Sequence, residues 1–212
     1  MRKKIRISIE FLLSVLMTLT MIPIFQVTAA TNDYRDVRSN DWFFDSVQYV
    51  NEKKCMFGTS ESSFEPQTTM SRAMVVTVFH RMEGEPEAAV SKFSDIPADT
   101  WFSKSVAWAA ADEIVNGYSE DKFGPSDDVT REQIATILFR YADKKGYDVS
   151  GRADLSGYSD KDTVSDWAKD AAAYCYENGI LTDSGAIRPT ETIGRGEIAQ
   201  MIFNMLKLAG KI

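Results

Sequence analysis

The sequence predicts an all-α protein in which three helix-loop-helix repeats pack together as one pseudo-threefold domain. Three observations support this prediction. An aspartate is followed six or seven residues later by a tryptophan at three places, and a proline is followed six residues later by an arginine at three places. Apolar residues then stand 3, 6, 7 and 10 positions after each arginine, which is the spacing of one helical stripe. The sets are Asp36, Asp95, Asp160; Trp42, Trp101, Trp167; Pro66, Pro125, Pro189; and Arg72, Arg131, Arg195.

The first thirty residues have the layout of a secretory signal peptide. The cationic start MRKKIR is followed by an apolar stretch from Phe11 to Phe25 and by the small residues of QVTAA, with cleavage expected after Ala29 or Ala30. An uncleaved membrane anchor is the alternative. Its apolar run would be shorter than the ~20 residues that span a bilayer, and Pro23 interrupts it. We therefore expect an exported chain that has no membrane segment after cleavage.

Each repeat is predicted to contain two helices joined by a turn-rich loop that ends at the proline. The first helix begins at or near the tryptophan, and the second begins at the arginine. Gly179 is well placed to end the first helix of the third repeat in a left-handed conformation. Lys54 and Glu113 stand at that position in the other repeats, which predicts a different kind of helix end there. A repeat of about fifty residues buries little core alone, so the three stripes are expected to pack against one another. The repeats are expected at residues 31–84, 90–145 and 156–212.

Charge and cysteine content exclude several classes of function. The whole chain has a formal charge of −7, and without residues 1–30 it has 20 basic and 30 acidic residues, a net −10. Such a chain should bind neither nucleic acid nor an anionic bilayer non-specifically. Cys55 and Cys175 lack zinc-ligand spacing, and they are expected to be small buried side chains, with one long-range disulfide as the alternative.

The second repeat carries a family resemblance. The stretch FSDIPADTWFSKSVAWAAADEIVNGYSEDKFGPSDDVTREQIATILFRYA resembles the S-layer homology (SLH) domain, and the likeness extends over the chain after the signal peptide. The resemblance implies a three-pronged helical spindle, secretion to the bacterial cell surface, and non-covalent binding to acidic, often pyruvylated, secondary cell-wall polysaccharide. It also implies that the arginine of a TRAE-like tetrapeptide contacts ligand. The matching tetrapeptides are Ser71-Arg72-Ala73-Met74, Thr130-Arg131-Glu132-Gln133 and Gly194-Arg195-Gly196-Glu197.

Two interpretations of the arginines remain open from the sequence. Thr130 and Gln133 form a capping box that places Arg131 in the first helical turn, where its guanidinium and the free amides could receive a carboxylate or phosphate. Alternatively, the arginines pair with the repeat aspartates and hold the repeats together. The groove that contains Arg131 is expected to be the strongest site. The tryptophans are expected to be core anchors, with sugar stacking as the alternative. The candidate ligand-binding residues are Arg72, Arg131, Arg195, Asp95, Trp101, Gly117 and Tyr118.

Catalysis finds little support in the sequence. His80 is the only histidine and has no partner motif, so we expect it to be satisfied by neighbours or solvent-facing. The acid pairs Asp112-Glu113 and Asp127-Asp128 lack the spacing of a calcium-binding EF-hand loop. Three repeats leave no residues for a catalytic domain such as a wall hydrolase. We therefore expect no enzyme activity, cofactor or metal, with a Ca²⁺ site in so acidic a chain as the alternative. The expected partner is wall polysaccharide, and the alternative is an adaptor that pairs with another surface protein.

Overall fold

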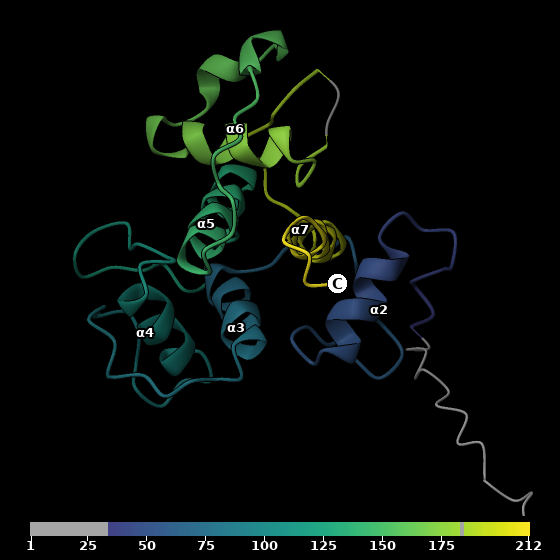
Figure 1. Cartoon of the computed structure of the whole chain (residues 1–212). Coiled ribbons are helices and arrows are strands. Elements are labelled where there is room, and N and C mark those ends of the chain that lie inside the picture. Colours follow the sequence, from purple (N-terminus) through teal and green to yellow (C-terminus); the bar gives the residue numbers. More distant parts are fainter. Residues whose placement is uncertain (1–33, 183–184) are drawn as a thin grey trace, which may run out of the picture. The chain divides into compact units, whose positions relative to one another are not determined.

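The computed structural model describes residues 34–182 and 185–212, which contain six α-helices, three short 3-10 helices and no strand. This confirms the predicted all-α class (Figure 1). The predicted signal peptide, residues 1–30, lies outside the described residues. The elements are α2 (Phe44–Glu52), α3 (Arg72–Met82), α4 (Ser103–Ala111), α5 (Arg131–Lys144), η1 (Leu155–Gly157), η2 (Lys161–Thr163), η3 (Asp166–Ala168), α6 (Lys169–Glu177) and α7 (Arg195–Leu208).

The first helix of each repeat is short and ends in the same way three times. α2, α4 and α6 each begin two residues after the repeat tryptophan. Just after each of them, one residue takes a left-handed conformation, with φ of 58° at Lys54, 59° at Glu113 and 63° at Gly179. The expectation of different helix ends was therefore wrong. The turn is set by the packing that follows it, and Lys54 and Glu113 adopt it although glycine would do so with less strain.

The second helices begin at the predicted arginines but differ in their N-caps. The Thr130 hydroxyl accepts from the Gln133 amide, and the Gln133 side chain accepts from the Thr130 amide, so the predicted capping box of α5 is present. Ser71 caps α3 through the Met74 amide alone. Gly194 supplies no side-chain cap to α7. The second repeat thus has the most fully capped helix of the three.

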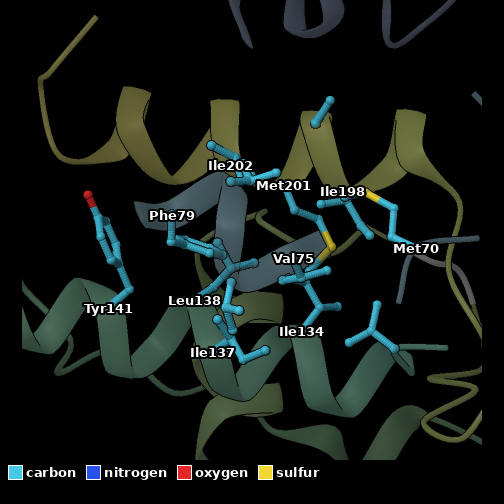
Figure 2. Close-up of a cluster of buried hydrophobic side chains, with 14 of the residues drawn as sticks. Met70, Val75, Phe79, Ile134, Ile137, Leu138, Tyr141, Ile198, Met201 and Ile202 are labelled. Atoms are coloured by element: carbon cyan, nitrogen blue, oxygen red, sulfur yellow. The ribbon is translucent and has the colours of Figure 1, made fainter. Parts of the chain in front are cut away.

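The apolar stripes of α3, α5 and α7 form the centre of the core. Side chains from the three helices meet one another in Figure 2. Nearly all of the predicted stripe is buried, and only Met82 is partly exposed. Burial of each large apolar side chain contributes roughly 1.5–3 kcal/mol, so these stripes are a major source of stability. The buried members are Val75, Val78, Phe79, Ile134, Ile137, Leu138, Tyr141, Ile198, Met201, Ile202 and Met205.

Helices pair across repeats rather than within them. The second helix of one repeat packs chiefly against the first helix of the next, which gives the pairs α3–α4 and α5–α6 (Figure 1). The third repeat returns to the first through α7–α2. The described residues accordingly form one compact unit. No repeat can therefore complete its own packing.

Backbone hydrogen bonds follow the same cyclic order. The Arg72 amide donates to the Asp127 carbonyl oxygen at 2.9 Å, and the Arg131 amide donates to Glu191 at 2.9 Å. The Arg195 amide donates to the Thr68 carbonyl oxygen at 3.0 Å. The next amide of each helix donates to the proline carbonyl of the same loop, so each second helix satisfies two of its orphan N-terminal donors on the neighbouring repeat. These contacts support the pseudo-threefold spindle, which stays a prediction.

Both cysteines are free thiols in the interior. Cys55 is 1% exposed and Cys175 is fully buried. Burial raises the pKa of Cys55 to about 11 and raises that of Cys175 as well, so neither forms a thiolate readily. This agrees with the expectation of small buried side chains.

Candidate functional site

The three repeat arginines are buried connectors between repeats. Each Nε donates to a loop carbonyl oxygen of the neighbouring repeat: Arg72 to Phe123 at 3.0 Å, Arg131 to Ile187 at 2.9 Å and Arg195 to Phe64 at 2.8 Å. Their exposed fractions are 6%, 2% and 8%. The arginine at the start of one repeat's second helix thus holds the loop of the next repeat.

The repeat aspartates hold the same loops from the other side. Asp95 accepts from the amides of Phe123 and Gly124 at 2.8–3.1 Å. Asp36 and Asp160 do the same within their own repeats: Asp36 accepts from Phe64 and Glu65, and Asp160 accepts from Ile187 and Arg188. One loop residue therefore donates its N–H to an aspartate and offers its carbonyl to an arginine. The predicted arginine clip is present, but its acceptor is a carbonyl, because the aspartate is already engaged by loop amides.

These aspartates predict a loss of stability in acid. Burial raises the pKa of each carboxyl, but the hydrogen bonds from loop amides outweigh it, so the pKa of Asp36, Asp95 and Asp160 lies below its ordinary value. A lowered folded-state pKa gives stability that is present above the unfolded pKa of about 3.9 and is lost as pH falls through the folded value. We expect the free energy of unfolding, measured with urea, to be level down to about pH 5 and to fall below about pH 4.

Asp95→Asn gives the matched comparison for the acid effect. The variant should be about 1–2 kcal/mol less stable at neutral pH, because a neutral amide oxygen accepts more weakly than a carboxylate. It should also lose less stability on acidification than the unchanged chain. An acid profile identical to that of the unchanged chain would show that Asp95 does not contribute to the effect.

A cavity of about 330 Å³ contains three of the seven candidate residues. We call it the Arg72 groove. It brings Arg72 of the first repeat to Gly117 and Tyr118 of the second, and Trp167 of the third repeat completes its wall. Three repeats thus contribute to one site. The groove is lined by Arg72, Val115, Asn116, Gly117, Tyr118, Gln133, Thr136, Ile137, Arg140 and Trp167.

Two guanidinium groups give this groove its charge. Arg72 lies between the rings of Tyr118 and Phe123, at 4.6 and 4.5 Å, and its Nη2 donates to the Asn116 carbonyl oxygen at 2.9 Å. Arg140 is half-buried on α5. Neither arginine forms an ion pair with any residue that the structure describes. Burial lowers the pKa of both groups, so an anion in the groove would compensate for the lost hydration.

Asn116 and Gly117 shape the groove's floor. With its amide oxygen turned toward Arg140, Asn116 lies 3.2 Å from both terminal nitrogens of that guanidinium. Gly117 is one of the candidate ligand-binding residues. A β-carbon there would lie 2.3 Å from the Lys122 carbonyl oxygen and 2.5 Å from the Phe93 ring, so the fold of the loop already requires glycine.

The other four candidate residues lie outside the Arg72 groove. Arg131 forms an ion pair with Glu197, and Arg195 donates to the carbonyl oxygens of Phe64 and Phe57. Asp95 closes its own loop, as described above. Trp101 lines a separate cavity of about 400 Å³ with Thr77 and Arg81. The expectation that Arg131 marks the strongest groove therefore disagrees with the geometry, because the second repeat's loop is completed by the arginine of the first repeat.

The tryptophans are exposed, which corrects the expectation of core anchors. Trp42, Trp101 and Trp167 have exposed fractions of 64%, 60% and 54%. Trp42 and Trp101 stand in the turn before α2 and α4, and Trp167 stands in η3 just before α6. The next residue packs inward instead, as Phe43 does at 5% exposure. Trp42 packs edge-on against the Phe43 ring, at 5.2 Å. The large indole faces therefore remain available to a ligand.

Sequence reasoning missed Arg140 and Asn116. Arg140 stands nine positions after Arg131, beside the apolar stripe, where the other repeats have Arg81 and Asn204. A polar residue at the edge of a stripe looks like an ordinary solvent-facing position. Only the fold shows that this edge faces the loop that contains Asn116.

His80 is satisfied, as expected. Its Nε2 donates to the Pro86 carbonyl oxygen at 2.9 Å, because a carbonyl can only accept. Its Nδ1 then accepts from the Ser105 hydroxyl at 3.1 Å. The ring also packs against Trp108 at 5.3 Å. These contacts account for both ring nitrogens and give His80 a structural role.

Within the described ranges, no cluster of three or more histidine, cysteine, aspartate or glutamate side chains is arranged to hold a metal ion. None of the helices described there is long and apolar enough to cross a bilayer.

The comparison with known families agrees with the repeat structure. The family described as S-layer homology domain matches residues 33–73, 92–135 and 157–199, which is more than half of the chain. The chain belongs to the S-layer homology domain family. Membership in this family indicates a secreted location at the bacterial cell surface or cell wall.

Curated relatives share this domain within much longer proteins. The chain is 29% identical over 177 residues to the surface-layer 125 kDa protein of Lysinibacillus sphaericus, which covers 81% of this chain and 14% of that protein. It is 27% identical to the S-layer protein of Bacillus licheniformis, covering 83% of this chain and 20% of that protein. An amylopullulanase of Thermoanaerobacterium thermosulfurigenes is 24% identical over 84% of this chain but only 10% of its own length. The shared part thus points to a non-catalytic domain.

Proposed function

We propose that this chain attaches non-covalently to the bacterial cell wall by binding an acidic secondary wall polysaccharide, such as one with a pyruvyl ketal, in the Arg72 groove. The observation that carries the proposal is the pair of arginines, Arg72 and Arg140, that line one cavity without a carboxylate partner among the described residues. In a chain with a net charge of −7, such a local excess of positive charge requires explanation. A planar carboxylate is a good acceptor for guanidinium donors.

The rest of the groove suits a sugar. The Trp167 indole is 54% exposed and lies at the groove's wall, where it can stack on a pyranose face. The side chains of Asn116, Gln133 and Thr136 offer hydroxyl and amide groups to sugar hydroxyls. The groove therefore combines a charged end for the acid with an aromatic and polar wall for the ring.

Retention on purified wall sacculi tests the proposed function. The chain should sediment with sacculi that retain their secondary polysaccharide and should stay in solution with sacculi from which that polymer has been stripped. Equal retention on both would contradict glycan binding and would favour a protein partner instead.

Arg140→Ala gives the sharper test, because Arg140 takes no part in the inter-repeat clips. Loss of one charge-assisted contact of about 1.5–3 kcal/mol should weaken binding to the intact polymer roughly 10- to 100-fold, measured as a dissociation constant. Arg35→Ala is the matched control, since Arg35 is exposed and lies outside the groove. It makes the same charge change and should leave binding unaltered. Equal weakening by both variants would indicate non-specific charge attraction.

A further inference from the structure

The third repeat contains a cavity at the position that corresponds to the Arg72 groove. It measures about 320 Å³. Trp42 takes the place of Trp167, and Gln200 and Met201 take the places of Thr136 and Ile137. A cavity of similar volume is therefore present at the corresponding position. The remaining lining residues are Ile180, Leu181, Thr182, Arg188, Glu197 and Asn204.

The charge of this cavity differs from that of the Arg72 groove. Asn204 stands where the second repeat has Arg140, and Glu197 stands where it has Gln133. At these two positions one cation is lost and one anion is gained. Asn204 instead donates to the Gly179 carbonyl oxygen at 3.0 Å. Arg188, which also lines the cavity, lies 3.4 Å from the Glu191 carboxylate. The third cavity thus lacks the unpaired guanidinium groups of the second.

Glu197 also forms an ion pair with Arg131, the arginine that a ligand in the third groove would need. Arg131 is the counterpart of Arg72, because each donates through Nε to the loop of the next repeat. Arg131 Nη1 donates to the Glu197 carboxylate. The Arg131 side chain is 2% exposed, against 32% for Glu197, and the cavity is lined by Glu197 but not by Arg131. The carboxylate stands between the arginine and the cavity.

The corresponding groove of the first repeat also lacks the features of an anion site, but for different reasons. Its counterparts of Asn116 and Gln133 are Phe57 and Met74, which offer no side-chain donor to a sugar. The guanidinium of Arg81, at the position of Arg140, lies over the Phe57 ring at 5.3 Å and pairs with Glu85 at 3.7 Å. The cavity lined by Thr77, Arg81 and Trp101 does not include Arg195.

We infer that Glu197 is a built-in carboxylate that fills the anion position of the third groove, so that each chain binds one acidic glycan residue, in the Arg72 groove. This inference rests on the proposed function and adds the specificity-determining residue to it. The second repeat differs because Gln133 is neutral, and a neutral amide leaves Arg72 open to an external acid. The chain's three homologous grooves therefore have different roles. The second and third grooves differ in charge at two positions, and Glu197 is the one whose side chain contacts the repeat arginine.

The stoichiometry of binding tests the inference. The probe is a synthetic methyl hexopyranoside that carries a pyruvyl ketal, titrated calorimetrically into the full chain, with the ketal-free sugar as the comparison. The unchanged chain should bind one molecule. The double variant Glu197→Gln with Asn204→Arg places the counterparts of Gln133 and Arg140 in the third groove and should bind two. A triple variant that adds Arg140→Ala to these two changes should again bind one sugar molecule at high affinity, now in the third groove.

The outcomes separate the inference from the proposed function. No binding of the ketal sugar to the unchanged chain would overturn both. One site in the unchanged chain and still one in the double variant would overturn the inference alone, as would two or more sites in the unchanged chain. Because removal of Glu197 leaves Arg131 buried without that carboxylate, each variant is first checked for a cooperative thermal transition. Glu197→Gln alone, which keeps an acceptor for Arg131, replaces the double variant if the latter does not fold.

Discussion

Replacement of Arg131 by alanine is expected to lower the free energy of unfolding by about 3 kcal/mol, which corresponds to a loss of roughly 6–12 °C in melting temperature for a domain of this size. The variant removes a guanidinium that is 2% exposed and leaves the Ile187 carbonyl without that donor and Glu197 without that partner. Removal of one member of a buried ion pair usually costs 3–5 kcal/mol. We expect the low end, because Glu197 is 32% exposed and keeps part of its hydration.

Two controls make the Arg131 result specific. The double variant Arg131→Met with Glu197→Met removes both charges together and should recover part of the lost stability, since an apolar pair leaves no unpaired buried charge. Arg35→Ala removes an exposed arginine and should shift stability by no more than about 0.5 kcal/mol. Urea and thermal unfolding measure all three. A melting temperature of the Arg131→Ala variant within about one degree of the unchanged chain would show that the clip contributes little.

The same experiment distinguishes the two interpretations of the arginine that the sequence left open. A ligand-binding residue would change affinity and leave stability intact, whereas a clip would do the reverse. The geometry divides these roles among the repeats. Arg131 is paired internally, and Arg72 is held by loop carbonyls while it also lines an open groove. Arg131→Ala should therefore leave the affinity for wall polymer nearly unchanged wherever the chain remains folded.

Much of the helical structure could be predicted because it is encoded locally. The spacing of Val75, Val78 and Phe79 defines which face of α3 is buried, and the capping box at Thr130 fixes where α5 begins. Such features depend on residues within a few positions of one another, so a single sequence displays them. The three copies then confirm one another.

The partners of these helices could not be predicted in the same way. An apolar stripe shows that a face is buried but not what covers it. Although α4 and α5 belong to one repeat, α4 packs on α3 and α5 packs on α6. Arg140 lines the groove because helices pair across repeats in this way. Similarly, Trp101 is exposed in the turn before α4, whereas Phe102, the N-cap residue of that helix, packs against the core. Residue type alone does not show which of these two aromatic side chains points inward.

Removal of the third repeat is expected to abolish cooperative folding of the other two. A chain that ends at Ser150 lacks α6 and α7, so α2 and α5 lose the helices on which they chiefly pack. The loop carbonyl of Phe64 loses Arg195 at the same time, and Glu132, which accepts from the Ser165 amide and hydroxyl at 3.0 Å, becomes a carboxylate without those donors. Small domains depend on the fraction of surface they bury, and this truncation removes burial from both remaining repeats.

The truncated chain should show a broad, non-cooperative thermal transition and little near-ultraviolet circular dichroism, even if helical signal persists in the far ultraviolet. A chain that ends at Gly210 is the matched control, because it loses only the exposed Lys211 and Ile212 and retains all of α7. It should melt as the full chain does. If the two-repeat chain instead unfolds cooperatively with a native near-ultraviolet spectrum, the repeats are separate folding units. Cyclic packing predicts the opposite. Because the third repeat packs on the first through α7 and α2, removal of any one repeat leaves the other two without part of their packing.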